Sequence, residues 1–118
     1  MYYIISAELS TLSERENIER TEELADLLEE REIPYQSTVG RFNGVKESSF
    51  VVFSEKVAEY YCKAFDQQCY MFVDRRGDAS LHAPDGEPLT FLGRTKTVPH
   101  EPLNSDYTKH KHGYLIVT

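Results

Sequence analysis

Apolar residues near the N-terminus follow first a strand pattern and then a helix pattern. The run Tyr2–Leu9 is apolar and rich in β-forming residues, which predicts a buried strand. Ser10–Ile33 then predicts a helix, because Ser13 and Glu16 fit a capping box in which each side chain bonds the other residue's backbone N–H. Residues spaced by four, three and four share one face of this helix: Asn17, Thr21, Leu24 and Leu28.

The next segments predict a hairpin and a second helix. Pro34–Phe42 has the pattern of a strand, Asn43–Gly44 is a strong turn signal, and Ser48–Phe53 predicts the returning strand. Ser54 can cap a helix whose apolar stripe comprises Val57, Ala58, Tyr61, Cys62 and Phe65.

The C-terminal half predicts shorter elements. Gln68–Asp74 is a further buried strand, two short strand-like segments cover residues 79–83 and 90–98, and residues 113–118 end the chain as a strand. Residues 98–112 are polar and poor in regular signals, which predicts a surface loop. The order predicts an α+β fold in a single domain over residues 1–118: a ferredoxin-like βαββαβ sandwich with additional C-terminal strands and both helices on one face of the sheet.

Composition narrows the function classes. The 118 residues carry 13 Lys+Arg against 20 Asp+Glu, a net charge of −7, and the longest basic run is Arg75–Arg76, so duplex nucleic-acid binding is not expected. An acidic protein that imitates DNA or opposes a basic partner stays open. No apolar stretch reaches the ~20 residues of a membrane span, and the N-terminus lacks the basic flank and cleavage site of a secretory signal, so we expect a cytoplasmic protein.

Few residues suggest metal or redox chemistry. Cys62 and Cys69, the only cysteines, are expected to be reduced thiols, and His110 and His112 lie too far from them in sequence to complete a zinc site. The chain also lacks a phosphate-binding glycine loop, a CxxC motif and a nucleophile elbow.

Glu47 is the first candidate site residue. It starts a strand, next to the hydroxyls of Ser48 and Ser49 and the ring of Phe50. On sequence alone a solvated polar residue is the more common interpretation. A carboxylate in this setting also suits a pocket wall, where a low dielectric constant strengthens its attraction to a cation.

Two residues of the first helix are candidates as well. Asn17 has the alternative of bonding loop backbone near the helix start, and Arg20 that of pairing with Glu16 or Glu23 on the helix surface.

Three stretches resemble the phage-encoded S-adenosylmethionine (SAM) lyases, long described as SAM hydrolases. They are "IISAELS" (Ile4–Ser10), "ENIERTEELADLL" (Glu16–Leu28) and "CKAFDQQCYMFVD" (Cys62–Asp74), and they cover roughly the first two thirds of the chain in the family's order. The resemblance implies a trimer with substrate held between subunits. It implies a reaction in which the substrate's own carboxylate attacks its γ-carbon, releasing methylthioadenosine and homoserine lactone, with no metal, cofactor or protein nucleophile.

The resemblance also assigns site residues. The family's glutamate falls on Glu47, and its tyrosine falls on Phe42, which keeps the ring and lacks the hydroxyl; Tyr35 is the alternative ring. Asn17, Arg20 and Ser48 are then expected to bind or orient the substrate.

Two functions follow from these assignments. The first is a SAM lyase that deprives host restriction systems of SAM, as a phage anti-defence enzyme. The alternative is a non-catalytic trimer that binds a nucleotide or a host defence protein.

Overall fold

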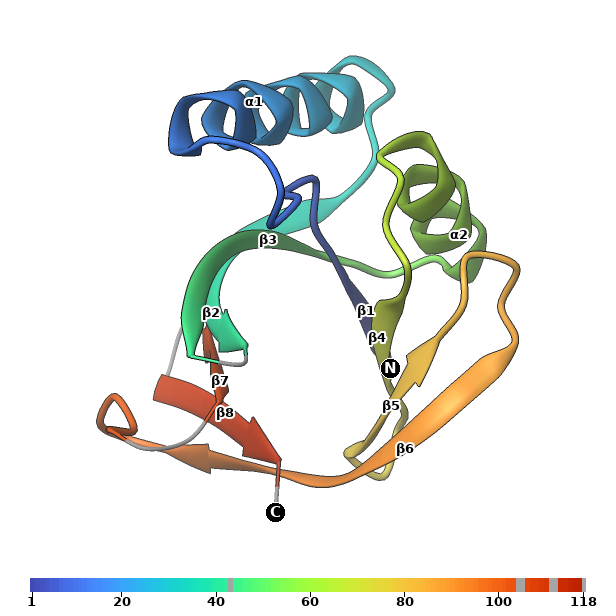
Figure 1. The fold of residues 1–118 in the computed structure, drawn as a ribbon. Coiled ribbons are helices and arrows are strands. Elements are labelled where there is room, and N and C mark those ends of the chain that lie inside the picture. The colour runs from blue at the N-terminus through green and yellow to red at the C-terminus, as the bar shows by residue number, and fades with distance from the viewer. Residues whose placement is uncertain (43, 104–105, 111–112, 118) are drawn as a thin grey trace.

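The computed structural model describes residues 1–42, 44–103, 106–110 and 113–117. Within these ranges the chain forms two helices and eight strands (Figure 1). In chain order they are β1 (Tyr2–Ile5), α1 (Glu14–Glu30), β2 (Tyr35–Phe42), β3 (Val45–Val52), α2 (Glu55–Ala64), β4 (Tyr70–Val73), β5 (Asp78–His82), β6 (Pro88–Val98), β7 (Tyr107–His110) and β8 (Gly113–Val117).

The strands form a closed barrel in the order β1-β3-β2-β7-β8-β6-β5-β4, and every neighbouring pair is antiparallel. The prediction of an open ferredoxin-like sandwich is therefore wrong. The element order of residues 2–73 does alternate as that fold requires, but the sheet continues beyond it. β5, β6, β8 and β7 carry the sheet around until β7 pairs with β2, which closes the sheet on itself.

The closure depends on a strand within the segment predicted as a loop. Tyr107–His110 forms β7, which pairs with β8 along the chain and with β2 across the barrel. Gly40 and Arg41 of β2 are the residues paired with β7 in the described part of the chain, and the Thr38 hydroxyl adds a hydrogen bond to the Lys109 carbonyl. This short seam closes the barrel.

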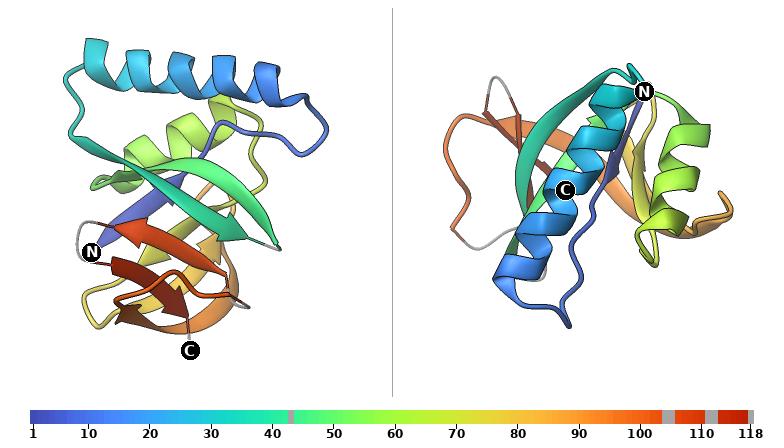
Figure 2. Two further views of the ribbon diagram at one scale, coloured as in Figure 1. Left: turned by 90° about the vertical axis from the view of Figure 1, so that its left-hand side faces the viewer. Right: turned by 90° about the horizontal axis from the view of Figure 1, so that it is seen from above.

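Both helices lie on the same side of the barrel (Figures 1 and 2). The capping box predicted for α1 is confirmed: the Ser13 hydroxyl accepts from the Glu16 N–H at 3.1 Å, and the Glu16 carboxylate accepts from the Ser13 N–H at 3.3 Å. Ser54 caps α2 in the same way, by accepting from the Val57 N–H. Both helices thus begin where the sequence predicts.

The main core lies between these helices and the barrel wall. Alternate strand residues face the helices, and Leu24 and Leu28 of α1 are fully buried against them. The strand residues in this core are Tyr3, Ile5, Phe50, Val52 and Tyr70. The packing fixes α1 over β1 and β3, the part of the barrel that carries the site described below. In the described residues, neither helix is both long and apolar enough to cross a bilayer.

The seam gives the first prediction. A Cβ added at Gly40 would lie 2.8 Å from the Tyr107 carbonyl oxygen, which is backbone and cannot rotate away. We expect Gly40→Ala to lower the free energy of unfolding by about 1–3 kcal/mol, as overpacking does. Urea denaturation followed by circular dichroism measures it, with Ser37→Ala, at an exposed position of the same strand, as the control. Equal stability of the two variants would show that the seam does not need the glycine.

Candidate functional site

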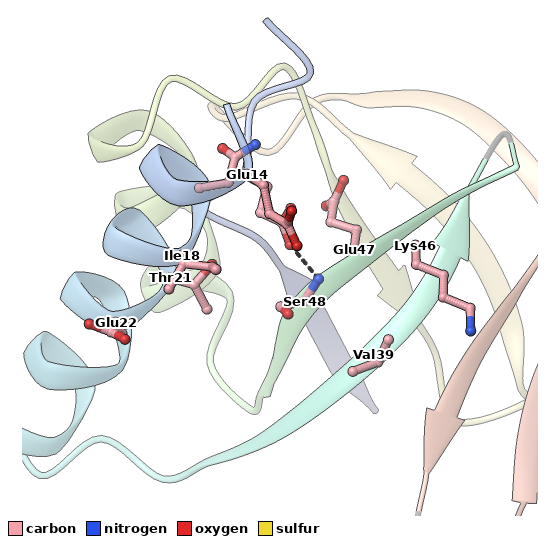
Figure 3. Close-up of a pocket in the computed structure, with 10 residues that line it drawn as sticks. Glu14, Ile18, Thr21, Glu22, Val39, Lys46, Glu47 and Ser48 are labelled. Atoms are coloured by element: carbon pink, nitrogen blue, oxygen red, sulfur yellow. Dashed lines mark hydrogen bonds between the residues drawn. The ribbon is translucent and has the colours of Figure 1, made fainter. Parts of the chain in front are cut away.

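A cleft of about 480 Å³ lies between α1 and the β2–β3 hairpin (Figure 3). Four carboxylates line it, namely Glu8, Glu14, Glu22 and Glu47, and within the described part of the chain Lys46 is the only cation among its lining residues. Two exposed apolar side chains, Ile18 of α1 and Val39 of β2, lie on its walls. The cleft is therefore mainly anionic, with apolar patches at its sides.

Glu8 and Glu47 form the innermost acidic pair. The Glu8 carboxylate accepts a hydrogen bond from the Ser48 N–H, drawn as a dashed line in Figure 3. Glu47 is the preceding residue on the same strand, and the charge of Glu8 acts on it. The Ser6 hydroxyl donates to the Ser48 carbonyl at 3.1 Å, which holds the chain after β1 against β3. The ends of these two strands therefore place two carboxylates together.

The pKa of Glu47 is raised above its ordinary value. Burial is the main cause, because it removes water from the charged form; the Ser6 hydroxyl lowers the pKa in part, and the neighbouring Glu8 charge raises it again. Burial also raises the pKa of the half-buried Cys69 thiol, with a further contribution from the charge of Glu47. A cation bound here would replace the lost hydration of Glu47 and bring its pKa down.

Three side chains hold the segment that carries Glu8. The Asn17 side chain both accepts from the Leu9 N–H at 2.9 Å and donates to the Leu9 carbonyl at 3.0 Å. Arg20 donates through Nε to the Ala7 carbonyl at 2.6 Å, and Gln67 donates to the Glu8 carbonyl at 2.9 Å. The backbone of residues 7–9 is thus bonded residue by residue from outside the sheet.

Arg20 also reaches the other helix. Its guanidinium donates to the Phe65 carbonyl and lies 5.4 Å from the centre of the Phe65 ring. The surface ion pairs with Glu16 or Glu23 that the sequence allowed for this arginine are not its arrangement here. Asn17 does bond the loop backbone, as one of its two interpretations predicts, and it also lines the cleft.

The structure brings some of the predicted site residues together and separates others. Asn17, Glu47 and Ser48 line the same cleft, whereas Arg20 does not. Tyr35 pairs with Val52 at the opposite end of the β2–β3 ladder, about 17 Å along the strand from Gly40, the partner of Glu47. Its hydroxyl donates to Glu29 at 2.8 Å. Phe42 ends β2 and pairs with Val45, but its side chain lies outside the described residues.

Sequence reasoning missed Glu8 and Lys46. Glu8 was included in the predicted strand Tyr2–Leu9, but β1 ends at Ile5, and the residues after it turn toward α1. A carboxylate just beyond the last apolar residue of a buried strand was the available signal. Lys46 precedes Glu47 directly, and the turn residues around it hid the fact that β3 already begins at Val45.

Within the described residues, no group of three or more His, Cys, Asp or Glu side chains is placed to hold a metal ion. Cys62 and Cys69 are free thiols, as expected. Burial, with a smaller effect from Cys69, raises the pKa of Cys62 to about 12, which keeps this thiol protonated at neutral pH.

The fold and the cleft define a closed antiparallel barrel with an anionic, partly apolar site of the size that a small cationic molecule needs. The model of the S-adenosylmethionine lyase family matches residues 3–118, and the chain belongs to this family. This match confirms the resemblance seen in the motifs. It also covers the C-terminal third of the chain, where no motif of the family was recognised. No curated protein sequence matches the chain.

The hydrogen bonds that hold the backbone of residues 7–9, here called the clamp, give the second prediction. Lysine has one ammonium group and cannot bond the Ala7 and Phe65 carbonyls with the fork of an arginine. We expect Arg20→Lys to lower the free energy of unfolding by about 1–3 kcal/mol, because a partly buried carbonyl loses its donor. Arg15→Lys is the matched control on the same helix, since the Arg15 side chain is 91% exposed. Chemical denaturation compares them, and an equal, small loss in both variants would contradict the clamp.

The raised pKa of Glu47 gives the third prediction. Because the folded-state pKa of Glu47 lies above its unfolded value, the ionised carboxylate opposes folding. The stability that the protonated carboxyl contributes is fully present below the unfolded pKa and is lost as the pH rises through the folded pKa. We expect Glu47→Gln to be more stable than the wild type at pH 7, with the difference vanishing at pH 4. Urea unfolding at both pH values measures this, with the exposed Glu23→Gln as the control. A less stable Glu47→Gln at pH 7 would contradict it.

Proposed function

We propose that this protein cleaves SAM to methylthioadenosine and homoserine lactone in the cleft between α1 and the β2–β3 hairpin. The observation that supports the proposal is the half-buried acidic pair Glu8 and Glu47 that lines this cleft, in a member of the SAM lyase family. SAM carries two cations, a sulfonium and an ammonium, and both favour an anionic site with low access to water.

The proposed reaction needs no proton transfer. An oxygen of the substrate carboxylate forms a bond to the γ-carbon while the bond from this carbon to sulfur breaks. The electron pair of the broken bond stays on sulfur, so the sulfonium becomes the neutral thioether of methylthioadenosine, and the carboxylate becomes the ester of the lactone. The protein contributes geometry, because holding reacting groups in contact replaces acid–base chemistry.

The charges in the cleft suit this reaction if Glu47 contacts the ammonium. The ammonium keeps its charge throughout, whereas the sulfonium loses its own, so an anion against the sulfonium stabilises the starting state more than the transition state. Exclusion of water from the cleft on binding would help further, because attack of the carboxylate on the γ-carbon neutralises the carboxylate and sulfonium charges. The exposed faces of Ile18 and Val39 offer apolar contact for the adenosine.

The assembly and biological role are proposed from the family resemblance. A homotrimer with a site between subunits would cover Ile18 and Val39, which are 52% and 41% exposed in the single chain. In a host cytoplasm, removal of SAM would deprive restriction-modification systems that depend on it, which is an anti-defence role. Neither a metal nor a cofactor is required by the proposed chemistry.

A second candidate rests on one residue. Phe42 stands where the family resemblance places a tyrosine, and it lacks the hydroxyl that could bond the reacting amino acid. A trimer that binds a nucleotide, or a host protein through its acidic surface, without turnover would fit this change.

The fourth prediction separates the two candidates. Purified protein incubated with SAM in ¹⁸O-water should yield methylthioadenosine and homoserine lactone by mass spectrometry. The ring oxygen of the lactone should carry no label, since it comes from the substrate. Glu47→Gln should lower kcat/KM by about 10- to 100-fold, the usual effect of losing a hydrogen bond to a charged group, and Glu23→Gln should not.

Other outcomes would decide against the lyase. Label at the γ-oxygen would mean hydrolysis by water. Absent turnover with a rise in Tm on adding SAM would favour the binding protein, and absence of both would exclude SAM as the ligand.

A further inference from the structure

Lys46 is the residue on which this inference rests. Of the side chains that line the cleft in the described part of the chain, it alone is cationic, and it directly precedes Glu47 on β3. Figure 3 shows the two side chains leaving the strand in different directions, with Lys46 directed toward the C-terminal strands. The cleft therefore has one cation beside its carboxylates, and this cation leaves the neighbouring position of β3 on the other face of the strand.

In the free protein the Lys46 ammonium is paired with Glu101, in the segment between β6 and β7. Its Nζ lies 3.5 Å from Glu101 Oε1, and the two side chains are 64% and 45% exposed. Ion pairs this exposed contribute little to stability, so the ammonium can exchange its partner for another anion. The four-carbon stem of lysine lets the ammonium move without moving the strand.

Glu101 keeps a partner when Lys46 leaves. The Tyr107 hydroxyl donates to the same Glu101 oxygen, and this bond, followed by the charge of Lys46, lowers the pKa of Glu101. The carboxylate therefore stays charged at neutral pH, as a standing competitor for the lysine.

Arg41 also holds the part of the chain that carries Glu101. Arg41 is the cross-strand partner of Lys46 in the β2–β3 ladder. Its guanidinium donates to the Pro102 carbonyl and lies 5.0 Å from the centre of the Tyr107 ring. Two residues of β2 and β3 thus reach the same segment, and Arg41 can hold it while Lys46 changes partner.

We infer that Lys46 recognises the carboxylate of the bound substrate by exchanging Glu101 for it, and so selects amino-acid sulfonium ligands over those that lack the carboxylate. The inference rests on the proposed function, because it takes SAM as the ligand. A ligand with cations alone would meet the acidic pair but would leave Lys46 on Glu101. A ligand that also has a carboxylate pairs with the acidic residues and with Lys46. Lys46 then orients the carboxylate oxygen that attacks the γ-carbon.

The fifth prediction compares two ligands. SAM and decarboxylated SAM share the nucleoside, the sulfonium and the ammonium, and they differ in the carboxylate. At low salt, Lys46→Met should raise the KM of SAM about tenfold, because a charged hydrogen bond is lost, and should keep the inhibition constant of decarboxylated SAM, which cannot form the lactone, within about twofold of the wild type. For turnover of SAM, KM should rise without a fall in kcat, because the carboxylate loses its charge in the reaction and the lysine therefore holds it more strongly before the reaction than in the transition state.

Matched variants sharpen this comparison. Lys46→Arg should keep the preference for SAM, and Lys56→Met, at an exposed position on α2, should leave both affinities unchanged. Glu101→Gln should bind SAM a few-fold more tightly, since the competitor for Lys46 is gone, without a matching gain for decarboxylated SAM. Glu101→Gln also tests the exchange in a protein that retains the lysine.

The outcomes distinguish the inference from the proposed function. Wild-type turnover of SAM together with equal losses of both ligands in Lys46→Met, or with no loss of either, would overturn the role of Lys46 and leave the lyase intact. Unchanged SAM affinity in Glu101→Gln would overturn the exchange. Neither binding nor turnover of SAM by the wild type would remove the proposed function and the inference with it.

Discussion

The site depends on one constraint: the backbone of residues 7–9 leaves the sheet after β1 and must find hydrogen-bond partners elsewhere. Buried backbone groups without partners are costly, so the chain supplies three side chains from two places, Asn17 and Arg20 on α1 and Gln67 before β4. These residues belong to the motifs that resemble the SAM lyases. Their observed contacts are structural, and their effect is to hold Glu8 where its carboxylate meets the N–H of Ser48.

The acidic pair is then a product of strand ends rather than of a single motif. Glu8 arrives from the segment after β1 and Glu47 from the start of β3, and the folded chain keeps them close although their charges repel. A bound cation would offset both the repulsion between the two carboxylates and the loss of hydration of Glu47, so the free site favours binding of a cation. Lys46, the residue just before Glu47 on β3, supplies the opposite charge. One short stretch of β3 thus presents both signs of charge to the cleft.

The sequence predicted the features that depend on neighbouring residues, such as the helix caps. It did not predict those that depend on residues far apart in the chain, such as the closure of the barrel. The caps at Ser13 and Ser54 and the apolar stripes of both helices follow from side chains within a few residues, and the structure has them where the patterns place them. Closure of the barrel depends on β7, a four-residue strand in a polar segment whose pairing with β2 joins residues far apart in the chain. Glu47 was found because a turn and a dense strand frame it. Glu8 was missed because its position depends on side chains that lie up to 59 residues away.

The seam between β2 and β7 has a consequence for how copies of this protein meet one another. Closure of a barrel keeps its strands from pairing with another molecule. The barrel opens most easily at the strand pair with the fewest paired residues. Here that pair spans Gly40 and Arg41 in the described residues, and opening it exposes two strand edges at once without unfolding the helical side of the barrel. Each edge could then accept the other edge of a second molecule, so the same opening that relaxes one chain offers a route to strand exchange and, at high concentration, to aggregation.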